Sequence, residues 1–522
     1  MRSSTSLGRT TGIVAAWLLG PSIAMAQASA SDAGRPTIDG RPIPKIWTDE
    51  ALAEWATPIA GLGIAPGHFS DAEYDRAPID ALRTYPVYHP AREPKGYRDW
   101  MKAQGPQPLI EPDRLKTKAD WIAAGERVFD QLDTAVARTD DPAALAHFSD
   151  PSAFDAARDE RHDVVTKEGI VLDYRWVVER DGKLKLSLGS CSSCHTHLMA
   201  DGSVLKGAPS NFDLAPTAAE RALLAGFDPQ PPLRRGAKLW QFFGVPWRAD
   251  DLHAQWKSAP DEIVAAFQRL DDGGPVGPTF DRFNGSPYFT TRMVDLIGVG
   301  QRRYLDATGT HVNRGPEDLA RYAILVEFAD NAVFGKHRFI TERNTQLKNR
   351  PSDAAAYALG LYLASLEHVA SPHPLDAEAR DGQSVFEHEG CAQCHPAPLY
   401  TSNELFRVAD FEPDPRDPAT ARLHISDYRI DTDPGLALRT RKGTGYYRVP
   451  TLRGLWYREL LEHSGSIATL EEWFDRARLE PDYVPSGWRG PGVKQRAVPG
   501  HEYGLDLSDE EKSALIAFLR TL

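Results

Sequence analysis

The pattern of apolar and polar positions predicts helices in four segments of the chain. Segments 121–129 and 376–386 are amphipathic, with apolar residues repeating at helical spacing along one face. A third segment follows Pro351-Ser-Asp and is apolar over 354–366, as in a buried helix. The fourth begins at Ser508-Asp-Glu-Glu511, a capping-box sequence, and continues through apolar residues 514–519. These segments, with 40 prolines and 41 glycines, indicate a mainly α fold with long loops.

A short sequence pattern occurs once in each half of the chain. Gly125-Glu-Arg-Val-Phe129 and Gly382-Gln-Ser-Val-Phe386 each lie in an amphipathic segment and precede a pair of cysteines. Four residues separate Phe386 from its first cysteine, whereas 61 residues separate Phe129 from its own. We therefore expect an insertion at about 131–190. Alternating apolar residues over 170–188, turning at Asp181-Gly182, predict a β-hairpin within it.

All four cysteines of the chain lie in two copies of the pattern Cys-x-x-Cys-His. The copies are Cys191-Ser-Ser-Cys194-His195 and Cys391-Ala-Gln-Cys394-His395. On a first helical turn, two thiols spaced in this way reach the vinyl groups of one haem, and the adjacent imidazole points at the iron. The pattern therefore predicts two covalently bound haem c groups.

Other cysteine chemistry fits the spacing less well. A structural zinc site usually places its cysteine pairs roughly 12–20 residues apart, whereas these pairs begin 200 residues apart. A thioredoxin-like dithiol would leave the two adjacent histidines to coincidence. Disulfides stay possible in an exported chain.

Composition and charge describe a globular, acidic and exported protein. The chain has 522 residues, of which 41% are hydrophobic and 25% charged. Residues 1–26 have the parts of a signal peptide: two arginines, a short apolar stretch and Ala-Met-Ala. Without them, 58 Lys and Arg oppose 73 Asp and Glu, a surface that disfavours nucleic acid and favours a basic protein partner. No other stretch is long and apolar enough for a membrane span, so we expect a periplasmic or secreted protein.

Three runs in the second half of the chain carry a resemblance to a known family. They are Val449-Pro-Thr-Leu-Arg-Gly-Leu455, then His463-Ser-Gly-Ser466 with Thr469-Leu-Glu471, and Gly500-His501 before the last helix. They resemble the bacterial dihaem cytochrome c peroxidases and MauG-like enzymes. The resemblance implies two cytochrome c-type haem domains and a haem-dependent, peroxidase-type oxidoreductase. It also implies that the N-terminal haem reacts with peroxide, while the C-terminal haem relays electrons from a small periplasmic cytochrome or cupredoxin.

The resemblance also implies roles for particular residues. His195 would be the proximal iron ligand at the reactive haem, and His395 the proximal ligand at the relay haem. Arg453 would lie near a haem propionate, a pairing that charge makes plausible. A calcium ion between the haems is a further family feature, although no convincing calcium loop is visible in the sequence.

The chain departs from this family at the sixth ligand of the relay iron. That ligand is usually methionine, or tyrosine in MauG, but none of the five methionines follows His395. Residues 473–478, where the family ligand tends to fall, contain neither type. We expect His501 to be the ligand, with His463 as the alternative. Two histidines would lower the reduction potential relative to His/Met ligation, and they resemble the arrangement in dihaem rubber oxygenases.

Candidates for chemistry at the first iron lie between the two haem motifs. Glu327, in a largely apolar helical stretch, could act as acid or base, and His311 could be a distal base. Met199 or Met293 could close the iron instead. Three functions stay open: a peroxidase or MauG-like oxidoreductase, a haem-dependent dioxygenase that uses dioxygen, and a non-enzymatic dihaem electron carrier.

These patterns divide the chain into four parts. Residues 1–26 are the signal peptide, and 27–115 are an N-terminal extension that wraps the haem domains. The first cytochrome c domain covers 116–345 and the second covers 346–522.

Overall fold

The structure is a computed structural model of the chain. It describes residues 35–46, 67–68, 82–132, 138–161, 164–188, 190–211, 279–280, 291–327, 333–334, 337–338, 351–413, 416, 420–439, 444–490 and 493–522. The predicted signal peptide, 1–26, lies outside the described residues. Within them, no helix is both long enough and apolar enough to cross a membrane.

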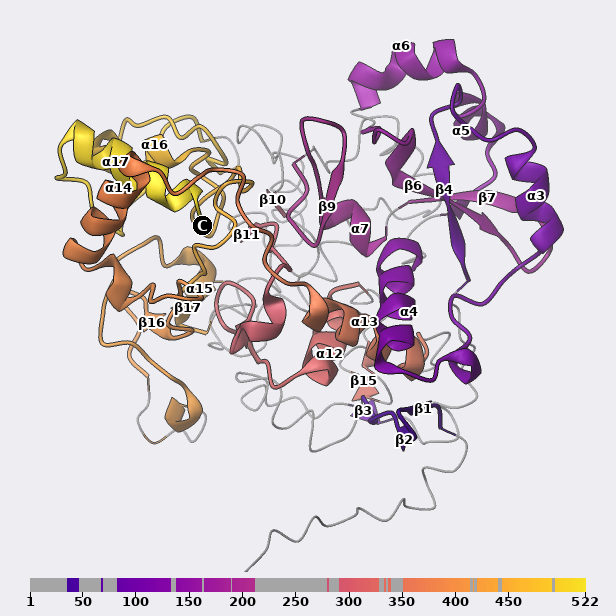
Figure 1. Cartoon of the computed structure of the whole chain (residues 1–522), viewed down its shortest axis with the longest axis horizontal. Helices are drawn as coiled ribbons and strands as arrows, with labels where there is room; N and C mark the ends of the chain where they lie inside the picture. Colours follow the sequence, from indigo (N-terminus) through magenta and orange to yellow (C-terminus); the bar gives the residue numbers. More distant parts are fainter. Residues whose placement is uncertain are drawn as a thin grey trace, which may run out of the picture.

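Three helices pack together at the centre of the molecule (Figure 1). They are α4 (Lys118–Gln131), α12 (Pro316–Glu327) and α13 (Asp353–Ser365). The side chains of Thr117 and Asp120 form a capping box that satisfies backbone N–H groups at the start of α4. Helix α13 is buried along most of its length, as its continuous apolar sequence predicts. The three helices enclose a shared hydrophobic core.

A second pair of helices forms the core of the C-terminal lobe, residues 371–522. Helices α14 (Ala377–His388) and α17 (Asp509–Arg520) cross at one end of the molecule, on the left in Figure 1. The predicted capping box at the start of α17 is confirmed, because the Ser508 and Glu511 side chains each accept the other's backbone N–H. Apolar side chains from α14, α17 and the loops between them complete a separate core.

The two copies of the repeated pattern make the same close helix contact. A Cβ added to Gly125 in α4 would lie 1.9 Å from the carbonyl oxygen of Ala358 in α13. A Cβ added to Gly382 in α14 would lie 1.8 Å from that of Ala514 in α17. Glycine is needed at both positions because the helix backbones approach this closely.

Aromatic rings repeat the same geometry. In each helix pair, the ring four residues after the glycine packs on the ring four residues after the alanine, with 5.3 Å between centroids. The pairs are Phe129 with Tyr362, and Phe386 with Phe518. The sequence repeat is therefore also a repeat in three dimensions.

The predicted domain boundary near residue 346 stays a prediction, but the structure shows which helices α13 packs against. A boundary near residue 346 would assign α13 to the second domain. However, α13 makes with α4 the contact that α17 makes with α14, and most of its side chains lie in the central core. The structure thus groups α13, through Ser365, with α4 and α12. A capped apolar helix has the same sequence pattern whether it begins or ends a domain. The pattern alone therefore does not show which helices α13 packs against.

The predicted hairpin is present and belongs to a larger sheet. Strands β6 (Ile170–Val178) and β7 (Leu184–Leu188) pair antiparallel around a turn in which Gly182 has φ +82°. Strand β4 (Thr84–Tyr88) pairs with β6 and β5 (Arg138–Thr139) with β7, in the order β4-β6-β7-β5. Part of the expected N-terminal extension is thus built into this sheet. That the sheet is an insertion in a cytochrome c domain stays a prediction.

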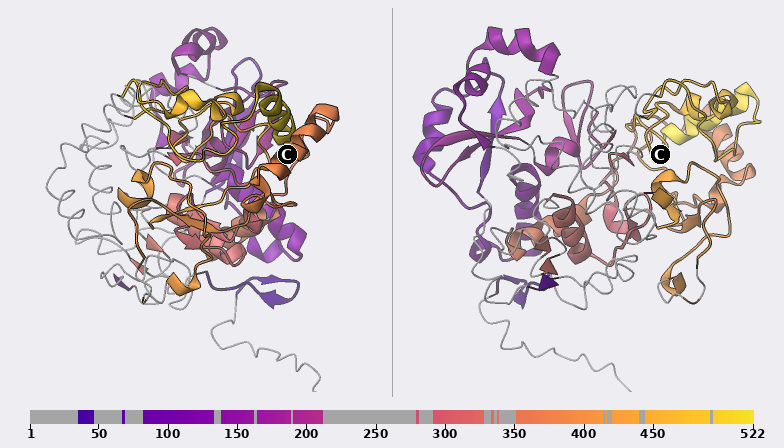
Figure 2. Two further views of the ribbon diagram at one scale, coloured as in Figure 1. Left: turned by 90° about the vertical axis from the view of Figure 1, so that its left-hand side faces the viewer. Right: turned by 180° about the vertical axis from the view of Figure 1, so that it is seen from behind.

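Helices surround this sheet at the end of the molecule opposite α17 (Figures 1 and 2). They are α3 (Tyr97–Gln104), α5 (Pro142–His147) and α6 (Pro151–Arg161). Their core is rich in aromatic side chains, including Phe148, Phe154 and Trp176. The fold therefore has more β structure than a single small hairpin.

The remaining elements are short. The helices are α7 (Cys191–Cys194), α15 (Gly435–Arg439) and α16 (Leu470–Trp473), with 3₁₀ helices at Pro112–Arg114, Val299–Gln301, Cys391–Gln393, Thr420–Arg422 and Arg476–Leu479. The strands are β1 (Thr37–Ile38), β2 (Arg41–Pro42), β3 (Gly67–His68), β8 (Thr196–Leu198), β9 (Val204–Lys206), β10 (Thr279–Phe280), β11 (Thr291–Arg292), β12 (Tyr304–Leu305), β13 (His311–Val312), β14 (Val333–Phe334), β15 (His337–Arg338), β16 (Leu405–Arg407) and β17 (Tyr446–Arg448).

Candidate haem sites

The two Cys-x-x-Cys-His motifs share one local backbone geometry. The His195 N–H donates to the Cys191 carbonyl at 3.1 Å, and the His395 N–H donates to that of Cys391 at 2.9 Å. The carbonyl of the second cysteine accepts a serine N–H in both motifs, from Ser210 at 3.1 Å and from Ser402 at 2.8 Å. Each motif is thus a single helical turn that places two sulfurs and one imidazole together. Within the described residues, the structure joins none of the four cysteines in a disulfide.

The serines of the first motif anchor it to the neighbouring sheet. Arg175 of β6, which is buried, donates to the Ser192 hydroxyl at 2.8 Å and to the Asp130 carbonyl of α4 at 2.9 Å. Ser193 donates to the Leu172 carbonyl at 3.3 Å. The two residues between the cysteines therefore fix the motif between β6 and α4. No local sequence pattern marks this role, because the hydrogen-bond partners are 17 or more residues away.

Residues 212–278 and 281–290, between the two haem motifs in the sequence, lie outside the described residues. Glu327 is the last residue of α12, but its side chain is also outside them. His311 is buried in β13, where its Nδ1 lies 2.6 Å from the Thr310 hydroxyl and its ring packs on Tyr322. The roles predicted for Glu327 and His311 stay predictions.

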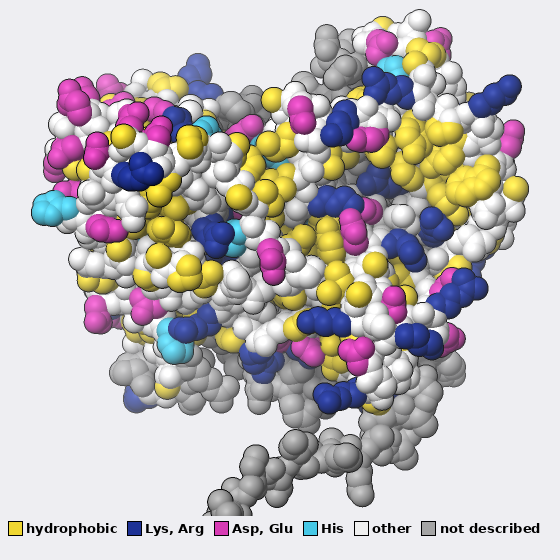
Figure 3. All heavy atoms as spheres, viewed as in Figure 1, with side chains coloured by type: hydrophobic (Ala, Val, Ile, Leu, Met, Phe, Trp, Pro, Cys, Tyr) yellow, Lys and Arg dark blue, Asp and Glu magenta, His cyan; other side chains and the backbone are white. Residues whose placement is uncertain are grey.

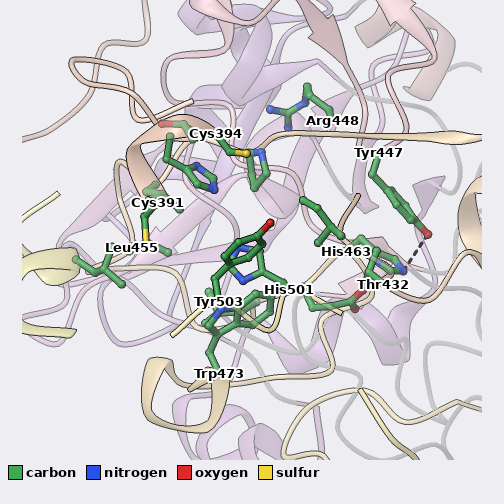
Figure 4. Close-up of a pocket in the computed structure, with 18 of the residues that line it drawn as sticks. Cys391, Cys394, Thr432, Tyr447, Arg448, Leu455, His463, Trp473, His501 and Tyr503 are labelled. Carbon is green, nitrogen blue, oxygen red and sulfur yellow. Dashed lines mark hydrogen bonds and ion pairs between the residues drawn. The ribbon is translucent and has the colours of Figure 1, made fainter. Parts of the chain in front are cut away.

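The second motif opens onto a cavity of about 240 Å³ in the C-terminal lobe (Figure 4). Cys391, Cys394, His395 and His501 all line it. The structure thus brings together the two predicted cysteines, the predicted proximal histidine and the preferred sixth ligand, from positions more than 100 residues apart. Apolar side chains form much of the wall: Phe386, Phe406, Leu455, Leu461, Trp473, Phe474, Leu515 and Leu519.

His395 is oriented as a proximal ligand would be. Its Nδ1 lies 3.1 Å from the Tyr400 carbonyl, so that Nδ1–H donates there and Nε2 is left with its lone pair. Burial lowers the pKa of His395 to about 4. The imidazole is therefore neutral at ordinary pH, as an iron ligand must be.

His501 has the properties of a second iron ligand. Burial, together with the nearby His395, lowers its pKa to about 3. Its Nδ1 is buried and has no hydrogen-bond partner among the described residues. Its ring packs against Trp473 and Tyr503, with centroids 5.2 and 5.5 Å away (Figure 4).

His463, the alternative ligand, is held by other partners. Its Nε2 lies 3.0 Å from the Tyr447 hydroxyl, and its Nδ1 forms an ion pair with Glu462 (Figure 4). Burial alone would raise the pKa of Glu462, but His463, Ser464 and Arg496 lower it to about 2. Because both ring nitrogens are engaged, His463 fits a hydrogen-bonded position better than an iron ligand.

Five arginines line the same cavity, and all of them except Arg478 form one cluster near Asp295. Arg302 and Arg458 are buried and Arg292 and Arg448 partly buried, while Asp295 accepts from Arg458 at 2.8 Å. Burial and the neighbouring arginines lower the pKa of Arg448 to about 9. Burial lowers that of Arg302 to about 10.

This cluster fits the anionic groups of a haem. Desolvated positive charge is costly unless anions accompany it, and the two carboxylates in the lining, Asp295 and Glu462, do not balance five guanidinium groups. The propionates of haem c, held by Cys391, Cys394 and His395, would supply the missing anions and accept charge-assisted hydrogen bonds. The cavity at the second motif therefore fits haem c, because it offers two cysteine sulfurs, two imidazoles and a cluster of positive charge.

Two further expectations from the sequence concern Arg453 and a bound calcium ion. Arg453 is not among the residues that line the cavity, and its backbone carbonyl accepts from Arg458 at 2.5 Å; its predicted role near a propionate stays a prediction. No group of three or more histidine, cysteine or acidic side chains gathers as metal ligands within the described residues. The calcium ion expected between the two haems stays a prediction.

Comparison with known proteins points to haem peroxidases, although no protein-family model matches the chain. The cytochrome-c peroxidase IdrP1 of Denitromonas iodatirespirans is 29% identical over 164 residues, which are 28% of this chain and 41% of that protein. The cytochrome c551 peroxidase of Nitrosomonas europaea is 24% identical over 149 residues, which are 28% of this chain and 35% of that protein. The chain thus matches less than half the length of either relative.

Among solved structures, the diheme peroxidase BthA from Burkholderia thailandensis E264 shares 20% sequence identity with this chain. The TM-score is 0.26, and the match covers 49% of this chain and 76% of that one. A TM-score this low supports no conclusion by itself. The two curated relatives confirm the predicted resemblance to bacterial cytochrome c peroxidases.

Proposed function

We propose that the protein is an exported dihaem c-type cytochrome that acts as a peroxidase-type, MauG-like oxidoreductase. Peroxide is reduced at the first haem site, Cys191–Cys194 with His195, and electrons arrive through the second site, Cys391, Cys394 and His395. The names of the two curated relatives, both cytochrome c peroxidases, support the reaction class. The signal-peptide pattern of residues 1–26 supports export to the periplasm or beyond.

The observation that carries this division of roles is the pair of histidines in the second cavity. His395 and His501 both line this cavity, and together they would hold the iron of one haem and leave no ligand position on it for peroxide. Haem c bound at the two sites supplies the one-electron chemistry. An iron with no vacant ligand position can still transfer electrons but cannot bind peroxide. We therefore assign peroxide binding to the first site.

The residues around the second cavity prepare it for this role. Burial keeps both imidazoles neutral, so they can bind iron without first losing a proton. The clustered arginines Arg292, Arg302, Arg448 and Arg458 would neutralise the propionates of a bound haem, and their positive charge would favour reduced over oxidised iron. The apolar wall limits the access of water to the metal.

The surface of the C-terminal lobe supports a basic electron donor. Acidic side chains gather near α16 and α17 (Figure 3), and the first turns of these helices carry Glu471, Glu472, Asp509, Glu510 and Glu511. Complementary charge speeds the encounter of electron-transfer partners. A small basic cytochrome or cupredoxin fits this surface, whereas nucleic acid does not.

Electron paramagnetic resonance of the ferric protein, before and after peroxide, tests the proposal. We expect one high-spin signal from the first site, one low-spin signal from the second, and a change on adding peroxide. Turnover with peroxide should then oxidise a reduced small cytochrome. Two low-spin signals and no reaction with peroxide would show an electron carrier instead.

A dioxygenase is the second candidate, because the two histidines resemble the arrangement in dihaem rubber oxygenases. Such an enzyme would hold a stable oxygen complex in its ferrous form and would not oxidise the reduced cytochrome. Optical spectra of the reduced protein in air distinguish this outcome from peroxidase activity.

A further inference from the structure

Arg478 is buried beside the loop that carries His501. It lies in the 3₁₀ helix Arg476–Leu479 and is 1% exposed. Its three guanidinium nitrogens donate to backbone carbonyls: Nε to Trp473 at 2.8 Å, Nη1 to Val498 at 2.6 Å and Nη2 to His501 at 2.9 Å. Within the described residues, no carboxylate lies within ion-pair distance of it. A buried charge without a counter-ion is unusual, and here each of the three guanidinium nitrogens donates to a backbone carbonyl.

The backbone of His501 is fixed from two sides. Its N–H donates to the Ile430 carbonyl at 2.9 Å, and its carbonyl accepts from Arg478. His501 has φ +50°, in the left-handed region that residues with a side chain rarely adopt. Gly500 also has positive φ, and a Cβ there would lie 2.4 Å from the Ile430 carbonyl oxygen. This conformation persists only if surrounding contacts enforce it.

Arg478 also contacts the aromatic side chain that packs on the His501 ring. Its guanidinium carbon lies 5.3 Å from the centroid of the Trp473 ring, which in turn lies 5.2 Å from the His501 ring. One side chain therefore restrains both the backbone of His501 and a neighbour of its imidazole. Arg476, two residues earlier, is exposed and pairs with Asp506 at 2.9 Å.

We propose that Arg478 is a positioning residue for the second haem, holding His501 where its imidazole reaches the iron. This inference rests on the proposed function, in which His501 is the sixth ligand of the relay haem. Without the three hydrogen bonds, the 498–501 loop can relax from the strained conformation and the imidazole leaves the iron for part of the time. An added ligand then competes for that position.

The test uses four variants of the haem-loaded protein: H501A, R478Q, R478K and the exposed control R476Q. Carbon monoxide binding to the reduced protein is measured by optical titration, and spin state by electron paramagnetic resonance. In the wild type, only the first haem should take carbon monoxide readily. In H501A, the second haem should become high-spin when oxidised. When reduced, it should bind one further equivalent of carbon monoxide.

For R478Q, we expect the second haem to bind carbon monoxide at least roughly tenfold more tightly than in the wild type. R478K, which keeps the charge and some of its donors, should fall between R478Q and the wild type. R476Q should match the wild type. Covalent haem content and far-ultraviolet circular dichroism establish that each variant is folded. If R478Q does not accumulate, R478K gives the same comparison with a smaller effect.

The outcomes separate this inference from the proposed function. If H501A keeps a low-spin second haem, His501 is not the iron ligand. Both the proposed ligation and the positioning role of Arg478 are then wrong. If H501A becomes high-spin while R478Q and R478K bind carbon monoxide like R476Q, the ligation stands and the role of Arg478 is overturned.

Discussion

Gly382→Ala tests the close helix contact that organises the C-terminal lobe. The added Cβ would lie 1.8 Å from the Ala514 carbonyl oxygen and 2.9 Å from the Leu515 nitrogen, whereas an ordinary contact is 3.4 Å or more. Helices α14 and α17 must therefore separate by about 1.6 Å at this point. Because the obstacle is backbone, no change of rotamer relieves it.

The magnitude follows from two opposing effects. Overpacking of this kind costs about 3 kcal/mol, the upper part of its usual range. Alanine is favoured over glycine in a helix by roughly 0.5–1 kcal/mol, which offsets part of that cost. We expect a net loss of about 2 kcal/mol, which lowers the melting temperature of a domain of this size by roughly 4–8 °C.

The assay is denaturant unfolding of the haem-loaded protein, followed by the absorbance of the second haem. Midpoints are compared within this transition, because a chain with two lobes need not unfold in one step. Ser384→Ala, on the exposed face of α14, is the matched control and should change stability by less than about 0.5 kcal/mol. If Gly382→Ala and Ser384→Ala unfold at the same midpoint, the close contact between α14 and α17 is wrong.

Three further predictions use other parts of the structure. Gly125→Ala should destabilise the core around α4 and α13 by a similar amount, because the added Cβ would lie 1.9 Å from the Ala358 carbonyl oxygen. The low-spin spectrum of the second haem should stay unchanged. Loss of that spectrum would contradict the separation of this core from that of the C-terminal lobe. Arg448→Gln should lower the reduction potential of the second haem by roughly 60 mV in a spectroelectrochemical titration, whereas an unchanged potential would place Arg448 away from the haem. Glu462 has its pKa lowered from 4.5 to about 2, so its stabilising contribution is present above pH 4.5 and is lost as the pH falls toward 2. The stability difference between wild type and Glu462→Gln should therefore shrink over that window in acid unfolding curves, and a difference independent of pH would refute the ion pair with His463.

Local patterns predicted the parts of this molecule that depend on neighbouring residues. The spacing within each Cys-x-x-Cys-His motif, the cap at Ser508 and the hairpin turn at Gly182 each involve a few adjacent positions, and the structure has the predicted cap and turn. His501 was also a sound candidate, because a histidine in a Pro-Gly-His loop is a local feature. The structure places it in the cavity beside His395.

Contacts between distant segments could not be predicted in this way. The arginines of the cavity come from positions 292, 302, 448, 458 and 478, and none has a sequence pattern that distinguishes it from a surface arginine. The resemblance favoured Arg453, whose role near a propionate stays a prediction. The packing of α13 on α4 depends on Gly125 meeting Ala358, a contact across 233 residues.

The measurement that tests the central claim most directly is the haem content of the mature protein. The protein should be produced in a host competent for cytochrome maturation, then denatured, and its intact mass compared with that of the polypeptide alone. We predict an increase equal to two haem groups, both retained after denaturation and giving the pyridine haemochrome spectrum of haem c. A mass equal to that of the bare polypeptide would contradict the account, and so would a single retained haem.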